Sequence, residues 1–231
     1  MFTLETFDAI LVIESFLCQH LGLSNERTRK PMPKATDRPY HHGDLRRAII
    51  DTAMDMLHEN KSWQFTLREV ARRAGVSHAA PYKHFPDKAT LLAEISLIGF
   101  DQLREVLTKS SANAQQSIRA EIFAMAESYM HFAATNPALY RLMFSAELGK
   151  EPEIHLSDRA LATLGVIVEV LERGQAEGRI RKRDIRGQTA ACWGQMHGLA
   201  MLSIDGLLLP EKVGPEALQH ALTALLEGLE Q

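Results

Sequence analysis

The chain has 231 residues, of which 45% are hydrophobic, and its formal net charge is -3. This length accommodates one large domain or two modest ones, and the apolar content is ample for the packed core of a soluble globular protein. The two cysteines, Cys18 and Cys192, lie far apart, which excludes a disulfide framework and a cysteine metal site and indicates the reducing cytoplasm.

The charge is distributed unevenly along the chain. Residues 1–26 hold four acids and no Lys or Arg, residues 27–90 hold thirteen basic and seven acidic residues, and residues 91–231 hold thirteen and eighteen. A basic segment with a net charge of +6 therefore precedes an acidic one with a net charge of -5. This asymmetry indicates a polyanion as the partner of the basic segment alone.

Residues 1–39 are expected to form an N-terminal extension and a basic linker. The apolar run FDAILVIESFLCQHLGL is interrupted by acidic residues and lacks the basic flank of a signal peptide, so neither export nor a membrane span is predicted. The following RTRKPMPKATDRP is typical of a flexible linker. Met32 lies in this linker, which raises the hypothesis that translation begins there and that residues 1–31 are not in the native product.

Helical periodicity begins after residue 42. In GDLRRAIIDTAMDMLHEN the apolar residues recur at steps of three and four, which predicts an amphipathic helix. Thr66 and Glu69 have the spacing of a capping box, so a second helix should begin at Thr66 and end at Gly75, which can adopt the left-handed conformation. Ser77 is a good N-cap for a third, short helix that tolerates Pro81 near the end of its first turn.

The remainder of the chain also has helical rather than alternating periodicity. A long connecting helix should run from Asp87 to about residue 109, and we find no internal repeat and no convincing strand. Further helices are expected near residues 114–135, 137–146, 155–177, 185–208 and 215–230. The predicted fold is therefore all-α, with a three-helix helix-turn-helix domain over residues 40–90 and a helical bundle over residues 91–231.

Two stretches resemble a known family. The succession FTLREVARRAGVSHAAPYKHFPDKATLL resembles the DNA-binding domain of TetR/AcrR-type transcriptional regulators, and the match extends from Asp44 to Leu92. The stretch WGQMHGLAML, residues 193–202, resembles the Trp-His-Gly signature of the C-terminal domain in one branch of that family. The first match is specific because many positions coincide at fixed spacing.

The chemistry of the third helix suits DNA. Ser77 and the free amides after it are well placed to bind a phosphate, and a helix in the major groove presents its first residues to base edges. Here these residues are His78, Ala79 and Ala80, so base readout would rest on one imidazole and on methyl contacts with thymine. Lys83 is expected to reach a guanine edge or a phosphate.

The resemblance also implies contacts that fix the register on DNA without reading bases. The resemblance assigns contacts with the phosphate backbone to Thr66, Tyr82, His84 and Lys88. Phe85 anchors the helix to the core. Lys34 and Arg38 in the basic linker are expected to act as an arm on the phosphates or in the adjacent minor groove.

Taken singly, these residues have ordinary structural explanations. His78 and His84 are typical of two surface histidines, and without a matching cysteine or carboxylate set no metal site is predicted. Tyr82 alone would be a half-buried aromatic residue, and Lys83 and Lys88 alone would be solvated charges. The joint arrangement is what favours DNA.

The C-terminal bundle is expected to hold a pocket for an effector. Candidate wall residues are aromatic or apolar residues on helical faces together with one histidine: Phe100, Leu103, Met125, Tyr129, Phe132, Tyr140, Phe144, Trp193, His197 and Met201. Trp193 and His197 stand four apart, so both should project from one helix face. Ordinary core packing is the alternative for any one of these residues.

A homodimer is implied by the resemblance, because in the family the last two long helices pair with their symmetry mates. Here this points to residues 158–176 or 185–208, together with 215–230. The final helix carries an apolar stripe of Leu218, Leu222, Leu225 and Leu226, which we take as a candidate interface. A C2 dimer would set two reading helices about 34–36 Å apart.

The sequence thus predicts a ligand-responsive homodimeric transcription regulator, a repressor that an apolar small molecule releases from double-stranded operator DNA by linkage. We predict no catalytic residue and no cofactor. Three alternatives stay open: a DNA-binding regulator without an effector, a nucleoid-type DNA binder of low specificity, and an all-helical enzyme. The chain has no GxSxG, GxGxxG, Walker A or HExxH motif, which disfavours the enzyme.

Overall fold

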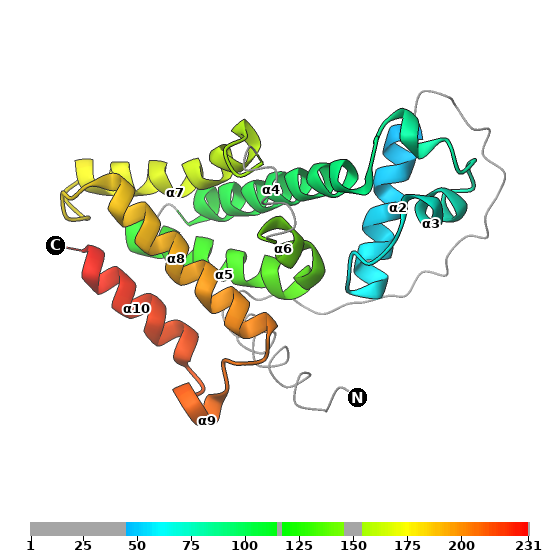
Figure 1. Ribbon diagram of the computed structural model, residues 1–231. Helices are drawn as coiled ribbons and strands as arrows, with labels where there is room; N and C mark the ends of the chain where they lie inside the picture. The colour runs from blue at the N-terminus through cyan, green and yellow to red at the C-terminus, as the bar shows by residue number, and fades with distance from the viewer. Residues whose placement is uncertain (1–44, 115–116, 146–153, 231) are drawn as a thin grey trace.

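The computed structural model describes residues 45–114, 117–145 and 154–230. Their fold is all-α: apart from an isolated antiparallel bridge between Ile180 and Glu230, the described residues contain no β-structure. A small head at one end of the molecule joins a larger helical bundle through one long helix (Figure 1). The predicted arrangement of a helical head and a helical bundle is confirmed.

The head consists of α2 (Leu45–Asn60), α3 (Leu67–Arg73) and the short 3-10 helix η1 (Pro81–Lys83). Helix α2 buries one stripe of apolar residues. The predicted capping box is confirmed at the start of α3, where the Glu69 amide donates to the Thr66 hydroxyl and the Thr66 amide donates to the Glu69 carboxylate. Gly75 has a φ of 70°, so a left-handed residue ends this helix as expected.

The third element of the head differs from the prediction of an α-helix beginning at Ser77. The Ala80 amide donates to the Ser77 carbonyl at 2.9 Å, and only then does η1 begin at Pro81. In an α-helix capped at Ser77, the first i to i−4 hydrogen bond would come from residue 81, and proline has no amide hydrogen to donate. Residues 77–80 therefore form a tight turn, and the single 3-10 turn of η1 follows it.

The bundle is arranged around α4 (Lys88–Asn113), which begins at the head where Asp87 accepts a hydrogen bond from the Thr90 amide at 2.8 Å. It packs against α5 (Ile118–Thr135), α6 (Pro137–Met143) and α7 (Asp158–Ala176). Helix α8 (Ile185–Ile204) covers α5 and α7, and α10 (Ala217–Leu229) lies on α5 and α8. Helix α4 extends well beyond residue 109, where the sequence suggested an end.

The C-terminal end is more broken than expected. Helix α8 ends at Ile204 instead of residue 208, because Gly206 takes a φ of 67° and the Leu207 amide donates back to the Leu202 carbonyl at 2.8 Å. A short α9 (Pro210–Val213) follows, and Gly214 with a φ of 86° separates it from α10. No helix in the described ranges is long and apolar enough to cross a membrane.

Candidate functional site

The exposed face of the head is formed by the turn around η1. Ser77, His78, Ala79, Tyr82, Lys83 and His84 all expose their side chains there, and Tyr82 is 48% exposed. Phe85 is buried in the opposite direction, and the Arg46 guanidinium lies 5.5 Å from the centre of its ring. The buried phenyl ring thus fixes the turn while its polar side chains face outward.

Two of the predicted DNA contacts meet a different environment. Ala80 is only 8% exposed, so its methyl group packs largely inside the head, and its contact with a thymine stays a prediction. The Thr66 hydroxyl is exposed but donates to the Glu69 carboxylate at 2.9 Å. Hydrogen bonds from the Thr66 amide and hydroxyl also lower the pKa of Glu69, so a carboxylate stands beside the proposed phosphate contact.

The remaining predicted contacts divide into two groups. Lys88 is half-buried, with its Nζ 5.7 Å from the centre of the Phe65 ring, at the junction between the head and α4. Lys34 and Arg38 lie outside the described residues. Nothing in the described part of the chain groups three or more His, Cys, Asp or Glu side chains in a way that could hold a metal ion.

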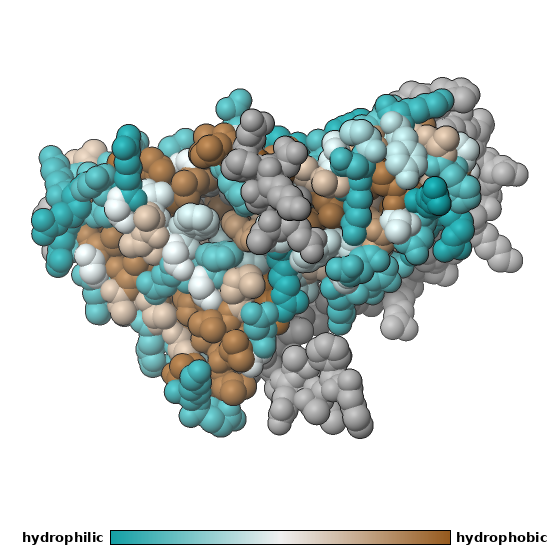
Figure 2. All heavy atoms as spheres, in the orientation of Figure 1, coloured by the Kyte–Doolittle hydropathy of each residue, from teal (hydrophilic) through white to brown (hydrophobic). Residues whose placement is uncertain are grey.

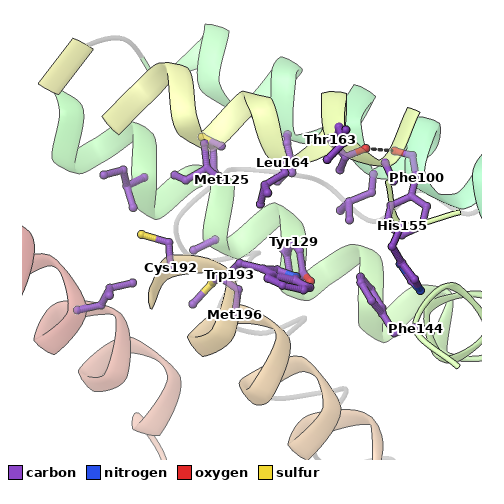
Figure 3. A pocket seen from close by; sticks show the side chains of 18 of the residues that line it. Phe100, Met125, Tyr129, Phe144, His155, Thr163, Leu164, Cys192, Trp193 and Met196 are labelled. Atoms are coloured by element: carbon purple, nitrogen blue, oxygen red, sulfur yellow. Dashed lines mark hydrogen bonds between the residues drawn. The ribbon is translucent and has the colours of Figure 1, made fainter. Parts of the chain in front are cut away.

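The bundle encloses a cavity of about 360 Å³ between α4, α5, α7, α8 and α10 (Figure 3). Six of the predicted wall residues line it: Phe100, Leu103, Met125, Tyr129, Phe144 and Trp193. Leu156, Leu161 and Trp193 line the cavity and are also exposed, which places its mouth between α7 and α8. The volume falls in the range of natural small-molecule sites.

Four predicted wall residues do not line the cavity. Phe132 is buried in the core elsewhere on α5, and Met201 is half-buried near the end of α8. Tyr140 is fully buried behind the wall, and His197 lies beside it. Trp193 and His197 do neighbour each other, with ring centres 6.2 Å apart, but the cavity meets only the tryptophan.

The sequence analysis missed the contribution of α7 and of the turn before it. His155, Thr163, Leu164 and Ile167 line the cavity, as do Cys192 and Met196 on α8. The regular apolar spacing within α7 was a usable signal, because it marks a buried face. Burial raises the pKa of the Cys192 thiol to about 11, so this cysteine is a neutral part of the wall.

A chain of hydrogen bonds leads away from the cavity wall into the core. The Tyr129 hydroxyl lies 2.8 Å from the Tyr140 hydroxyl, and that hydroxyl lies 2.8 Å from Nδ1 of His197. Burial raises the pKa of Tyr129 to about 12, raises the pKa of Tyr140 further, and lowers the pKa of His197. All three groups are therefore neutral near pH 7.

The apolar stripe of α10 faces the interior of the single chain, and its place in a dimer interface stays a prediction. Leu222 and Leu226 are buried, Leu218 packs on the core, and Leu222 and Leu225 line the cavity. The stripe is needed to cover α5 and α8 within one chain. Exposed apolar residues gather instead after and at the end of α8 and on α9, where Figure 2 shows hydrophobic atoms at the surface: Leu202, Leu207, Leu209 and Val213.

An ion-pair network connects the head to the helix that forms one cavity wall. Arg46 of α2 lies 2.9 Å from the Glu94 carboxylate on α4, and the other Glu94 oxygen lies 3.2 Å from Arg159 in the first turn of α7. Arg159 Nε also donates to Asp101 at 2.8 Å. Four residues after Arg159, Thr163 in the cavity wall donates to the Phe100 carbonyl at 2.9 Å.

A head that exposes a helix-turn-helix face, attached to a cavity-bearing helical bundle, defines a class of DNA-binding transcription regulators. The chain belongs to the TetR family: residues 49–95 match the family described as bacterial regulatory proteins, tetR family, and residues 122–227 match a tetracyclin repressor-like C-terminal domain. The two matches cover the head and most of the bundle.

Solved structures of similar proteins share this fold. A Rhodococcus sp. RHA1 protein of unknown function is 30% identical, with a TM-score of 0.69 over 84% of this chain and 100% of that chain. A TetR-family transcription regulator from Marinobacter aquaeolei VT8 is 16% identical, with a TM-score of 0.57 over 82% and 97%. The fatty acid degradation regulator FadR from Bacillus halodurans is 17% identical, with a TM-score of 0.62 over 82% and 98%. The last two show a shared fold.

Proposed function

We propose that this TetR-family regulator is a homodimeric repressor that leaves its operator when a small apolar molecule occupies the cavity. The observation that carries the proposal is that α4 joins a head with an outward-facing polar turn to a bundle with an apolar cavity. The head corresponds to residues 40–90 and the ligand and dimer domain to residues 91–231.

The exposed turn supports DNA binding in two ways. His78 and Ala79 are free to meet base edges, while Ser77, Tyr82 and Lys83 are free to meet the phosphate backbone. His84, Lys88 and Thr66 would make further contacts with the phosphate backbone. Lys34 and Arg38 would act as a basic arm on the phosphates or in the adjacent minor groove.

A second copy of the chain would dock on α8. Gly187, Gly194 and Gly198 repeat on one face of this helix, and a Cβ added at any of them would meet nothing within 4 Å. Small residues allow a partner helix to approach closely, and the exposed leucines after α8 extend the same apolar surface. A symmetric pair of heads would then read a palindrome-like operator.

The test is fluorescence anisotropy on the intergenic DNA upstream of the protein's own gene and on a scrambled duplex, at several salt concentrations. Tyr82→Ala and Lys83→Ala should weaken binding to the intergenic DNA, each by about 1–3 kcal/mol if a base is read and by less for one phosphate. Lys109→Ala, which changes an exposed lysine on α4 far from the head, should leave the affinity unchanged.

The alternatives predict other outcomes in the same experiment. Equal, salt-steep binding to both duplexes would indicate a nucleoid-type binder. Sequence-specific binding without any thermal stabilisation by a panel of metabolites would indicate a regulator without an effector. Absence of DNA binding would contradict the proposal and favour the enzyme.

A further inference from the structure

The polar groups of the cavity wall restrict what the cavity can bind. Within the described residues, no Lys, Arg, Asp or Glu side chain lines it. The Thr163 hydroxyl is already engaged by the Phe100 carbonyl, and the Cys192 thiol is neutral because burial raises its pKa. A carboxylate entering this cavity would lose its hydration without gaining a Lys or Arg partner, and such burial is costly. Apart from His155, the described wall therefore offers an anion no basic side chain.

Tyr129 supplies a neutral hydrogen-bonding group at one end of this wall. Its hydroxyl lies 2.8 Å from the Tyr140 hydroxyl, which in turn lies 2.8 Å from Nδ1 of His197. A neutral imidazole carries a single N–H, so the chain has two proton arrangements. If Nδ1 of His197 is bare, Tyr140 donates to it, Tyr129 donates to Tyr140, and the Tyr129 oxygen can only accept from the cavity.

The other arrangement reverses every hydrogen bond. If Nδ1 of His197 carries the proton, it donates to the Tyr140 oxygen, Tyr140 donates to the Tyr129 oxygen, and the Tyr129 hydrogen is free to donate into the cavity. The imidazole tautomer thus decides whether the Tyr129 hydroxyl offers a donor or only an acceptor to the cavity. In neither arrangement does it offer a charge.

The opposite end of the cavity is apolar. Ile122 lies seven residues before Tyr129 on α5, which corresponds to about 10 Å along the helix, and Leu222 and Leu225 of α10 line the cavity with it. A ligand with its polar group at Tyr129 would therefore bury an apolar body of that length.

We propose that the effector is a neutral molecule with an elongated apolar body and a terminal hydroxyl or carbonyl group that hydrogen-bonds to Tyr129, and that the tautomer of His197 adapts to this group. This proposal rests on the proposed function, because it assigns the ligand of the same cavity. Tyr129 is the binding residue, and Tyr140 and His197 are positioning residues behind it.

The experiment compares probes of equal chain length by calorimetry: n-octanol, methyl hexyl ketone, octanoate and n-octane. For the wild-type protein we expect n-octanol and the ketone to bind more tightly than n-octane by roughly 2- to 10-fold, which is the range for one hydrogen bond, and octanoate to bind most weakly. Tyr129→Phe should abolish the preference for the polar probes while retaining n-octane binding, which shows that the cavity is intact. Thr108→Val, which removes an exposed hydroxyl on α4 away from the cavity, is the matched control and should bind like the wild type.

A second readout addresses the positioning residues. In protein labelled with ¹⁵N-histidine, His197 bound to the ketone should be protonated at Nδ1, because a ketone only accepts hydrogen bonds and requires Tyr129 to donate. An Nε2-protonated His197 in that complex would overturn the relay. The ligand assignment is overturned if octanoate binds most tightly, if Tyr129→Phe keeps the preference, or if no probe binds. Tight octanoate binding that is lost in His155→Phe would identify His155 as the partner of an anion.

The failure of this proposal is distinguishable from the failure of the proposed function. A protein that binds its operator but rejects the neutral probes contradicts the ligand class alone. A protein that binds the probes without binding the operator contradicts the regulator.

Discussion

Glu94 and Arg159 form an ion pair between α4 and α7, with 3.2 Å between Oε1 and Nη1, and the second oxygen of Glu94 holds Arg46 of the head at 2.9 Å. One carboxylate thus joins the first turn of a cavity-lining helix to the helix that supports the recognition turn. Arg46 in turn lies against Phe85, which anchors that turn. In the proposed mechanism, a shift of α7 on ligand binding would reach the head through these contacts.

This route can be interrupted without changing the cavity. Arg46→Met removes the link from Glu94 to the head and leaves the pair of Glu94 with Arg159 in place. We expect n-octanol affinity to stay unchanged, while the factor by which n-octanol weakens operator binding falls by about 2- to 30-fold, equivalent to about 0.5–2 kcal/mol of coupling. Arg47→Met is the control, because Arg47 pairs with Asp51 of its own helix. Equal effects of the two substitutions would argue against the route.

Glu121 offers a test of how a buried charge stabilises the bundle. Its side chain on α5 is buried and bonds to Arg173 of α7 and Ser111 of α4, whereas Arg173 is partly exposed. Arg173→Met should therefore lower the free energy of unfolding more, by about 3–5 kcal/mol, because it leaves a buried carboxylate unpaired. Glu121→Gln should cost only about 1–3 kcal/mol.

The measurement for this pair is urea unfolding at one fixed protein concentration. Arg119→Met removes a partly exposed pair with Glu230 and should cost less than about 1 kcal/mol. A larger loss for Glu121→Gln than for Arg173→Met would contradict the explanation.

His197 should make stability depend on pH. Burial lowers its pKa in the folded state below the ordinary value near 6.5, so the unfolded chain binds this proton more readily. The free energy of unfolding should then fall as the pH drops below about 6.5 and be retained above it. His197→Gln should reduce this slope below about pH 6.5, and His131→Gln at an exposed site is the matched control. Thermal unfolding across this range checks both, and identical slopes would contradict the assignment.

Two glycines on neighbouring helices should respond to alanine with opposite signs. A Cβ at Gly99 of α4 would lie 2.6 Å from Sδ of the buried Met143 and 3.1 Å from Leu139, while one at Gly165 of α7 would meet nothing within 4 Å. Gly99→Ala should destabilise the protein by about 1–3 kcal/mol through overpacking. Gly165→Ala should stabilise it by up to about 1 kcal/mol through helix propensity. The measurement is the midpoint of denaturant unfolding, compared at an unchanged m-value: it should fall for Gly99→Ala and rise for Gly165→Ala.

The proposed dimer can be tested on the open face of α8. Gly194→Gln adds a side chain where the single chain has space, so the protein should fold normally but the close approach of a partner helix should be lost. Light scattering coupled to gel filtration should show a dimer for the wild type and for Thr108→Gln, an exposed control on α4, and a monomer for Gly194→Gln. A dimeric Gly194→Gln protein would move the interface elsewhere.

Local sequence signals predicted the head well. The reciprocal hydrogen bonds of Thr66 and Glu69 and the left-handed Gly75 each depend on residues a few positions apart, so spacing alone determines them. The error at the recognition element was also local: the fixed φ of Pro81 suits the first turn of a helix starting at Ser77, but its missing amide removes the first α-helical hydrogen bond.

The cavity was less predictable because it depends on which helix faces meet. The periodicity of α10 indicated that Leu222 and Leu226 share a buried face, but it could not indicate whether a partner chain or the same chain buries them. Tyr140 illustrates the same limit: its aromatic character suggested a wall residue, and tertiary packing placed it one layer behind Tyr129.

The continuity of α4 has a mechanical consequence. The helix is unbroken from Lys88 beside the head to the cavity residue Leu103, so it acts as a lever with an arm of about 22 Å. A tilt of about 5° around the cavity would carry the head through about 2 Å. In a symmetric dimer both α4 helices would tilt, so the separation of the two heads could change by about 4 Å without the cavity opening. The spacing of major grooves on DNA is fixed, so such a change would disturb simultaneous binding by both heads.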